Sequence, residues 1–295
     1  MACAEQAEIL ATAINPTAAR LELEFECDRA AGHTILAASR QQAPLKVVRA
    51  FALEDGSALV HLHNVSGGVL AGDRLELRTR IGAEASAQLT TTGATRIYRA
   101  AERAPDAIQQ NHIRVEENGL LEYVPDPIIP YAGARFRQQT SIHLAQGAGL
   151  FWWEIVAPGR EARGEVFAYE RLQLAIDIRT PSRLIACERV RLEPRATDLS
   201  SLSRLGDYRY WASFYMCHVG ANPKSWLTVE QKLREIASRL TGDARWSIST
   251  LPADGLAVRC LAREGRSAIQ GLREIWNAAK LLLYGREAIL PRKVN

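Results

Sequence analysis

Long apolar runs, paired cysteines and a large excess of one charge are all missing from this sequence. No stretch approaches the roughly 18 uninterrupted apolar residues of a transmembrane helix, so no membrane partner is expected. The five cysteines are scattered without a CxxC pair, a pattern typical of reduced thiols in a cytosol. The first residues, MACAEQAEILATAINP, carry acidic side chains where a secretory leader carries basic ones. We therefore expect a cytoplasmic protein.

The charge balance argues against a nucleic-acid partner. Basic side chains number 37 and acidic ones 33, and the net charge of +4 over 295 residues is too small to require a polyanion. Arg74, Arg78 and Arg80 alternate with apolar residues and are balanced by Glu76, which favours a solvated sheet face. The 47% hydrophobic and 24% charged fractions are those of an ordinary globular protein.

Alternation with a period of two dominates the first two thirds of the chain. In residues 20–27 apolar and charged side chains take turns, and residues 73–81 repeat the pattern. Because strand side chains alternate between faces, this predicts a sheet with one buried and one solvated face. Further strands are predicted at 33–39, 46–51, 58–63, 86–92, 110–115, 120–124, 136–144, 150–156, 171–178 and 184–192. Strands without helices between them indicate a mainly β (α+β) fold of stacked antiparallel sheets.

The pattern changes near residue 220 to a helix–strand–strand–helix unit. Asn222 and Pro223 predict a helix start, and Gly242 a stop, around an apolar stripe at Trp226, Val229, Leu233, Ile236 and Leu240. Strands are predicted at 246–251 and 256–262, and a second helix from a Ser267 cap to Gly285. No Ser- or Gly-rich linker intervenes. We therefore expect one composite domain over 1–295, β-rich at about 18–215 and helix-containing at about 220–285.

His61 and His63 are candidate metal ligands because they lie two apart on a predicted strand and share one face. No spacing in the sequence supplies the two further ligands of a structural zinc site, and no HExxH or GxSxG is present. The glycine cluster at 67–73 lacks the Gly-Lys-Ser/Thr of a phosphate loop and precedes a strand, which favours a tight turn or bulge. A metal-dependent hydrolase using both histidines and a carboxylate remains an alternative.

Two carboxylates lie in otherwise apolar strands. Glu154 follows Phe151, Trp152 and Trp153, and Glu188 lies in a second such strand. A buried carboxylate needs a cation, hydrogen-bond donors or water, or else it stays protonated. Each is therefore either in a salt bridge with an arginine or in an acidic, water-lined passage through the sheets.

Three prolines within six residues mark the segment 121–136, LEYVPDPIIPYAGARF. Proline lacks a backbone donor and fixes φ, which excludes a central strand here. Ile128, Ile129 and Tyr131 nevertheless make the segment apolar. We expect a rigid extended loop that either covers an edge of the core or faces a partner.

The sequence resembles the UreD (UreH) family of urease accessory proteins. The resemblance rests on GGVLAGDRL (67–75), TTGATRIYR (91–99), the proline-rich segment 121–136, a WWE strand before GREARGEVF (159–167), and a terminal LPRKV (290–294). It implies a non-enzymatic maturation factor that binds a UreF-like partner, a UreG-type GTPase and apo-urease in a hetero-oligomer, dimeric within it. The family role is to support nickel insertion, so we expect nickel in transit and no tightly held cofactor.

The resemblance also assigns candidate residues. Glu154 and Glu188 match positions of a transient nickel path, and Asp73, which closes the glycine block, is either a third member or a cap in the turn. Isolated carboxylates with water bind Ni²⁺ weakly enough to release it, whereas several histidines would hold it. A protein that works in a complex should also expose apolar surface, and the proline-rich segment and the C-terminal helices are the candidate faces.

Overall fold

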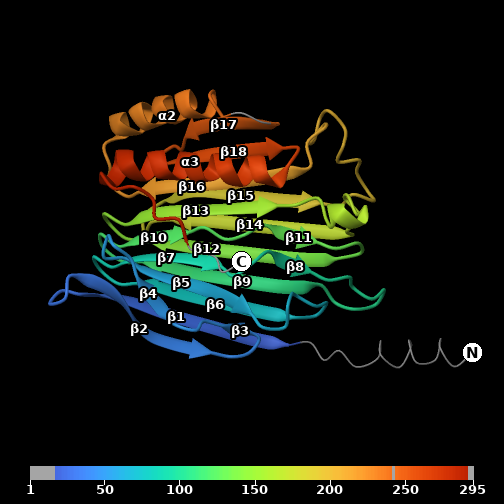
Figure 1. The fold of residues 1–295 in the computed structure, drawn as a ribbon, viewed down its shortest axis with the longest axis horizontal. Coiled ribbons are helices and arrows are strands. Elements are labelled where there is room, and N and C mark those ends of the chain that lie inside the picture. Colours follow the sequence, from blue (N-terminus) through green and yellow to red (C-terminus); the bar gives the residue numbers. More distant parts are fainter. Residues whose placement is uncertain (1–16, 241–242, 292–295) are drawn as a thin grey trace, which may run out of the picture.

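Two β-sheets packed face to face, with two helices on one of them, make up the fold (Figure 1). The computed structural model describes residues 17–240 and 243–291. Seven strands form the sheet that we call sheet A, in the order β15-β14-β12-β9-β6-β1-β2. Their bounds are β1 Ala18–Asp28, β2 His33–Gln41, β6 Arg74–Ile81, β9 Ala107–Val115, β12 Arg135–Leu144, β14 Arg171–Arg179 and β15 Leu184–Leu192. The mainly β class is confirmed.

Eleven strands form sheet B, whose main path runs β17-β18-β16-β13-β10-β7-β5-β3. Its strands are β3 Leu45–Lys46, β4 Ala50–Ala52, β5 Ala58–Asn64, β7 Ser86–Thr91, β8 Thr95–Ile97, β10 Leu120–Tyr123, β11 Ile128–Pro130, β13 Gly149–Val156, β16 Tyr210–His218, β17 Ala244–Thr250 and β18 Gly255–Ala262. The two strands between the helices, β17 and β18, thus belong to the same sheet as the strands of the β-rich part.

The prediction of antiparallel sheets is wrong for the middle of both sheets. β1, β6, β9, β12 and β14 pair in parallel, as do β5, β7, β10 and β13. The chain alternates between sheets, so each parallel neighbour in sheet A is reached through a strand of sheet B. Two parallel neighbours must be joined by a crossover connection, which usually contains a helix. Here the crossover contains strands of the other sheet instead. Antiparallel pairs occur towards the edges, such as β14–β15 and β13–β16.

Most predicted strands are present within a few residues of their expected bounds. The predicted strand at 46–51 is wrong, because this stretch forms only the ends of two short strands, β3 and β4. Strand β16 was not predicted. Its central residues are buried on both faces, between sheet A and the helices, so they show no alternation. The four described cysteines are free thiols, and Cys3 lies outside the described residues.

Helix α2 (Pro223–Ala237) begins as predicted, with the Asn222 side chain accepting a hydrogen bond from the Lys224 amide at 2.9 Å. It ends before Leu240, and the predicted stop, Gly242, lies outside the described residues. Helix α3 (Gly265–Tyr284) begins two residues before the predicted Ser267 cap and ends at Gly285, whose φ is 65°. Neither helix in the described part of the chain has the length and apolar character to span a membrane.

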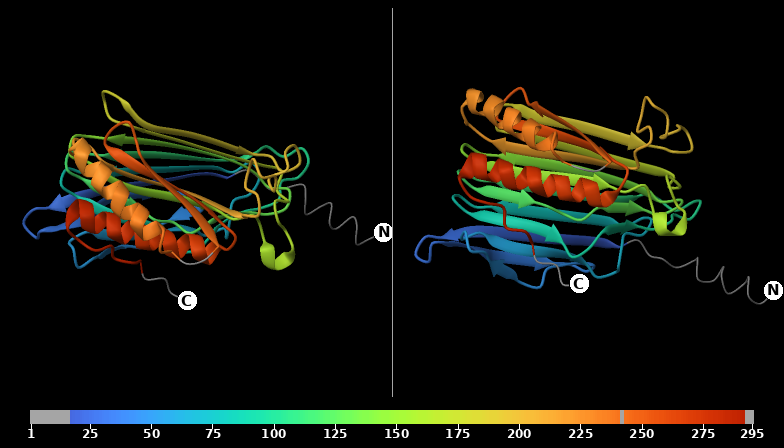
Figure 2. Two further views of the ribbon diagram at one scale, coloured as in Figure 1. Left: turned by 90° about the horizontal axis from the view of Figure 1, so that it is seen from above. Right: turned by 45° about the horizontal axis from the view of Figure 1, so that its top comes forward.

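The helices cover the outer face of sheet B, and within residues 17–240 and 243–291 no helix packs on the outer face of sheet A (Figure 2). Trp226 and Leu233 of α2 and Leu272 and Trp276 of α3 share an apolar cluster with outward-facing side chains of β13, β16 and β18. Between the sheets lies the rest of the core, in two further apolar clusters. The molecule is therefore three layers deep where the helices lie: sheet A, sheet B and the helix pair.

The proline-rich segment covers an edge of the core. Its middle forms the short strand β11, which pairs with β8 and, at Ile128, with β13. Ile128 is buried in one of the apolar clusters between the sheets, and the carbonyl oxygen of Pro125 accepts a hydrogen bond from Trp153 Nε1 at 2.9 Å. The exclusion of a central strand is wrong at Ile128–Pro130, because β11 has a paired strand on each side. Of the two roles considered for this segment, the structure supports the first.

Candidate functional site

A band of polar side chains crosses the space between the two sheets and separates two apolar clusters. Along β12, Phe136 belongs to one cluster and Ile142 to the other, and Gln138 and Thr140 lie between them. The same division recurs in β9, β13, β15 and β16. The polar band consists of Gln109, Asn111, Gln138, Thr140, Glu154, Glu188 and Ser213. Side chains from five strands of two sheets thus form one polar layer inside the core.

At one end the polar band opens into a cavity of about 260 Å³ between the sheets. Gln109 lines this cavity and donates from Nε2 to Asn111 Oδ1 at 3.1 Å, and Asn111 donates from Nδ2 to Thr140 Oγ1 at 3.0 Å. Asn111 and Thr140 are buried, so each amide and hydroxyl that is left unpaired would cost stability. These hydrogen bonds carry the polar layer from the cavity into the middle of the sandwich.

The cavity is lined by both glycine-containing sequence motifs. Gly67 and Gly68 from the first motif face residues 91–96 from the second. The amide of Val69 donates to the carbonyl oxygen of Arg96 at 2.8 Å, so the two segments run side by side. Gly67 has a φ of 81°, as expected for a tight turn. A Cβ on Gly68 would lie 2.7 Å from the Arg96 oxygen, so the close approach itself requires glycine.

Glu154 lies at the centre of the polar band. It is buried, and its Oε1 accepts a hydrogen bond from Nε2 of Gln138 on the facing sheet. Burial, and after it the charge of Glu188, raises the pKa of Glu154 from 4.5 to about 7. No arginine or lysine forms an ion pair with it within the described chain. At neutral pH Glu154 is therefore protonated more readily than an exposed glutamate.

Glu188 closes the other end of the polar band. Its Oε2 accepts a hydrogen bond from Ser213 Oγ at 2.8 Å, and its Oε1 lies 2.7 Å from Nη2 of Arg259. Ser213 pairs directly with Glu154 in the register of β13 and β16, and with Arg259 in the register of β16 and β18. The structure thus brings Glu154 and Glu188 together on either side of Ser213. For Glu188 the salt bridge to an arginine is present.

Asp73, the third candidate, lies elsewhere. It is buried in the turn before β6, where its Oδ1 accepts from the Thr17 amide at 3.1 Å and its Oδ2 from the Leu70 amide at 2.9 Å. Both carboxylate oxygens therefore serve the backbone, which supports the capping role. Of the three predicted residues, only Glu154 and Glu188 belong to the polar band.

Of the two histidines of the alternative metal site, only His63 is among the residues that line the cavity. The His61 ring meets the ring of Phe51 edge to face, with centroids 5.9 Å apart. Burial and the neighbouring His61 lower the pKa of His63. Within residues 17–240 and 243–291, no three His, Cys, Asp or Glu side chains are grouped to hold a metal ion. No described observation favours the hydrolase.

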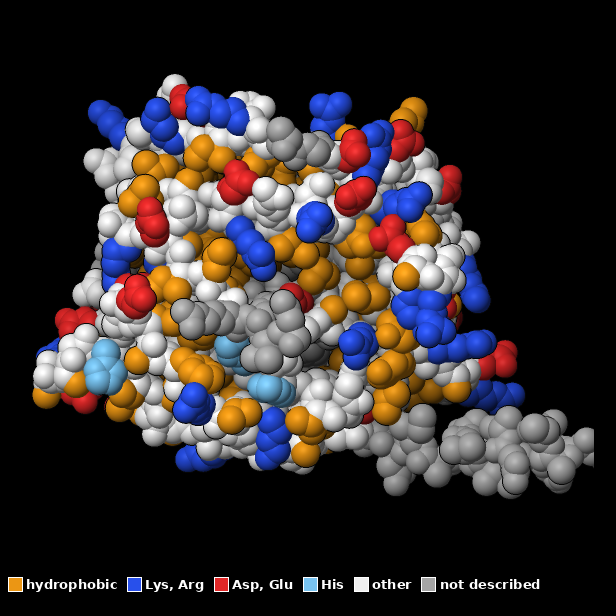
Figure 3. Space-filling model, viewed as in Figure 1, with side chains coloured by type: hydrophobic (Ala, Val, Ile, Leu, Met, Phe, Trp, Pro, Cys, Tyr) orange, Lys and Arg blue, Asp and Glu red, His pale blue; other side chains and the backbone are white. Residues whose placement is uncertain are grey.

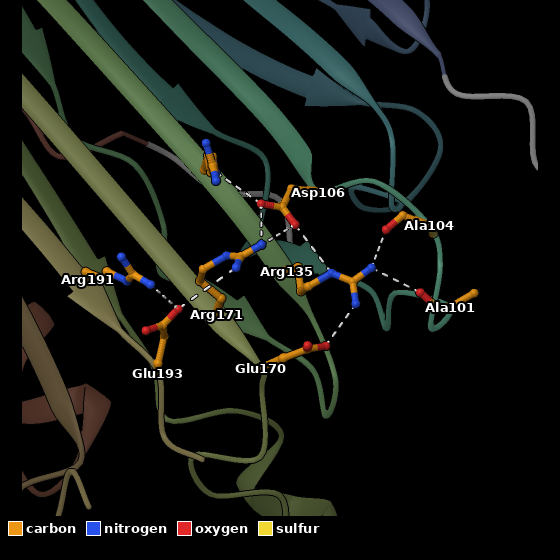
Figure 4. Close-up of polar contacts among 9 residues, drawn as sticks. Ala101, Ala104, Asp106, Arg135, Glu170, Arg171, Arg191 and Glu193 are labelled. Carbon is orange, nitrogen blue, oxygen red and sulfur yellow. Dashed lines mark hydrogen bonds and ion pairs between the residues drawn. The ribbon is translucent and has the colours of Figure 1, made fainter. Parts of the chain in front are cut away.

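A second polar cluster, made of arginine and carboxylate side chains, links the first residues of three strands in sheet A (Figure 4). Asp106, just before β9, accepts from Arg171 at 2.7 Å with both oxygens and lies 3.3 Å from Arg135 Nε. Arg135 also lies 3.0 Å from Glu170 and donates to the carbonyl oxygens of Ala101 and Ala104. Because each of these charges is paired, the cluster ties β9, β12 and β14 together.

Sequence reasoning found the two carboxylates of the polar band and missed its uncharged members and Arg259. Gln138, Asn111 and Thr140 occupy inward positions of alternating strands, and that position was the available signal. Carboxylate, amide and hydroxyl oxygens are ligands that bind divalent cations without a soft donor to retain them. The polar band therefore offers oxygen ligands of a kind that binds divalent cations weakly.

Comparisons with known proteins agree with the resemblance. The family model described as UreD urease accessory protein matches residues 17–295. A urease accessory protein UreD from Herpetosiphon aurantiacus is 45% identical over 263 residues, 88% of this chain and 91% of the relative. One from Pseudomonas aeruginosa is 34% identical over 272 residues, 92% and 93% of the two chains. One from a Bacillus species is 28% identical over 260 residues, 88% and 93%. This chain belongs to the UreD family of urease accessory proteins.

Proposed function

We propose that this chain is a maturation scaffold that supports nickel insertion into apo-urease and that Ni²⁺ crosses it along the polar band. The observation that carries the proposal is the position of the band. It runs between two apolar clusters from a cavity at one side to the Glu188–Arg259 pair at the other. A purely structural core would gain more from apolar side chains here, since buried polar groups stabilise little even when paired.

The proposal includes partners, because a path for a cation needs a donor and an acceptor. We assign the donor role to a UreF-like accessory protein with a UreG-type GTPase, and the acceptor role to apo-urease. The hetero-oligomer contains two copies of this chain and works in the cytoplasm. Exposed apolar side chains support such docking: Leu227 lies on α2, and Leu281 and Leu282 lie on α3. Figure 3 shows that apolar side chains are spread over this face.

Isosteric substitution in the polar band tests the proposal. Glu154→Gln and Glu188→Gln keep the shape and lose the negative charge. We expect GTP-dependent urease activation to fall in each variant and further in the double variant, with the accessory complex still assembled on a sizing column. Asp177→Asn is the matched control, because Asp177 lies on the outer face of β14 and pairs with Arg189 at 2.7 Å. Full activation by the double variant, with an intact complex, would remove the passage.

A further inference from the structure

Arg259 occupies the end of the polar band that faces solvent. The side chain of Arg259 is 36% exposed and that of Glu188 15%, whereas Glu154 is buried, so exposure increases from Glu154 through Glu188 to Arg259. Arg259, Ser213 and Glu154 are consecutive neighbours across β18, β16 and β13. A cation held between Glu154 and Glu188 therefore meets the guanidinium directly before it reaches water.

The guanidinium of Arg259 has a second interaction partner besides Glu188. Its Nη2 donates to the Tyr215 hydroxyl at 2.7 Å, and its central carbon lies 4.9 Å from the centre of the Tyr215 ring. Tyr215 is buried and fixed in the core between the sheets. Arg259 can thus lose Glu188 and still keep a hydrogen bond and a cation–π contact.

We propose that Arg259 is a displaceable counter-ion that closes the Glu188 end of the nickel passage and keeps cation binding there transient. This inference rests on the proposed function. The charges supply the reason. When both are ionised, Glu154 and Glu188 offer two negative charges, which would balance those of Ni²⁺ and slow its release. While Arg259 is paired with Glu188, only one negative charge remains unneutralised. The carboxylate of Glu154 then attracts the cation and the guanidinium of Arg259 repels it. It leaves by this end when Glu188 exchanges the guanidinium for the cation.

Nickel titration tests the proposal, with the full-length chain fused to a carrier protein that itself binds no nickel. Arg259→Gln removes the counter-ion, and we expect its Ni²⁺ affinity to be about tenfold higher than that of the unmodified chain. Arg259→Lys keeps the charge and should stay within about twofold. The control is Arg189→Gln, because Arg189 is next to Glu188 in the chain but pairs with Asp177. Unchanged affinity in Arg259→Gln would overturn the proposal.

A double variant links the effect to Glu188. In a Glu188→Gln background, Arg259→Gln should no longer raise the affinity, because the carboxylate that it frees is missing. Persistence of the tenfold gain in that background would refute the assigned partner. If the glutamine variant does not fold, as judged by circular dichroism, Arg259→Met keeps the buried stem of the side chain and carries the same expectation.

Urease activation separates this inference from the proposed function. Arg259→Gln should slow activation, because nickel leaves more slowly, and excess nickel should not restore the rate. If Glu154→Gln and Glu188→Gln leave activation intact, the passage itself fails, whatever Arg259 does. If they impair activation but Arg259→Gln matches the unmodified chain in both affinity and rate, only the counter-ion role fails.

Discussion

Glu122 on β10 and Lys280 on α3 form a buried ion pair, although 158 positions separate them in the chain. Lys280 Nζ lies 2.7 Å from Glu122 Oε1, and Trp276 Nε1 donates to Glu122 Oε2 at 2.7 Å. Lys280 Nζ also lies 3.1 Å from Asp55 Oδ2. Both side chains of the pair are 1% exposed. The last helix is therefore fixed to sheet B by charge as well as by apolar packing.

Removing the cation of this pair should destabilise the protein strongly. Lys280→Met leaves the buried Glu122 without its counter-ion, and we expect the free energy of unfolding to fall by about 3–5 kcal/mol in urea denaturation. Lys232→Met is the control, since Lys232 pairs with Glu235 on the surface of α2, where a loss below about 0.5 kcal/mol is expected. Adding Glu122→Gln to Lys280→Met should recover part of the loss, and no recovery would contradict this account.

Glu154 should make the stability depend on pH. Its pKa of about 7 in the folded chain exceeds the ordinary value of 4.5, because of burial and then of the Glu188 charge. Between these values the folded chain binds the proton and the unfolded chain does not, so stability falls as pH rises from 4.5 to 7 and is level above. Glu154→Gln should remove this fall and stabilise the chain at pH 8, relative to pH 4.5, by about 1–3 kcal/mol.

The measurement is urea denaturation of both proteins across that pH range. A parallel fall in the Glu154→Gln variant would assign the dependence to other groups. Other carboxylates shift in the opposite direction, such as Asp177 beside Arg189, whose pKa is lowered. The comparison is therefore made as the difference between the two proteins at each pH.

Gly68 should tolerate no side chain, whereas Gly93 in the neighbouring motif should. A Cβ on Gly68 would lie 2.5 Å from Tyr98 Cε2 and 2.7 Å from the Arg96 carbonyl oxygen, and the latter is backbone that cannot turn aside. We expect Gly68→Ala to cost about 1–3 kcal/mol. Nothing lies within 4 Å of a Cβ on Gly93, so Gly93→Ala should change stability by less than about 0.5 kcal/mol. Equal melting temperatures for the two variants would contradict the packing of the motifs.

Asp73 should act in folding and leave nickel unaffected. Asp73→Ala leaves the amides of Thr17 and Leu70 without their acceptors, at a cost of about 1–3 kcal/mol in the free energy of unfolding. Its Ni²⁺ affinity, measured by the same titration as above, should equal that of the unmodified chain. A weaker affinity with unchanged stability would return Asp73 to the nickel path.

Strand positions could be predicted from the sequence, whereas strand directions could not. Alternation in β1 and β6 reports which side chains face the core, and it is the same for either direction of pairing. Direction depends on where the chain goes between two strands of one sheet. Here it goes through the other sheet, and no local pattern records that. Strand β16 escaped because both of its faces are buried, so apolar residues such as Phe214 and Tyr215 follow one another.

Only the charged residues of the candidate site could be predicted from the sequence. Glu154 and Glu188 stand out because carboxylates are rare in apolar strands. Gln138 and Asn111 carry no such signal, since neutral polar residues are common on solvated strand faces. Glu122 has the same signal as Glu154 but was not singled out, and its partner Lys280 lies among the apolar residues that α3 buries. Only the fold shows that these two meet.

The alternation of the chain between sheets gives the polar layer a fixed order. From the cavity outward its members are Gln109, Asn111, Thr140 and Gln138, Glu154, and Glu188 with Ser213, and Arg259 follows on Glu188; this is nearly the order of synthesis. The ribosome therefore synthesises the residues nearest the cavity first and Arg259 last. A chain cut short after β16 would contain both carboxylates but would lack Arg259, together with β18 and the two helices that cover this part of sheet B.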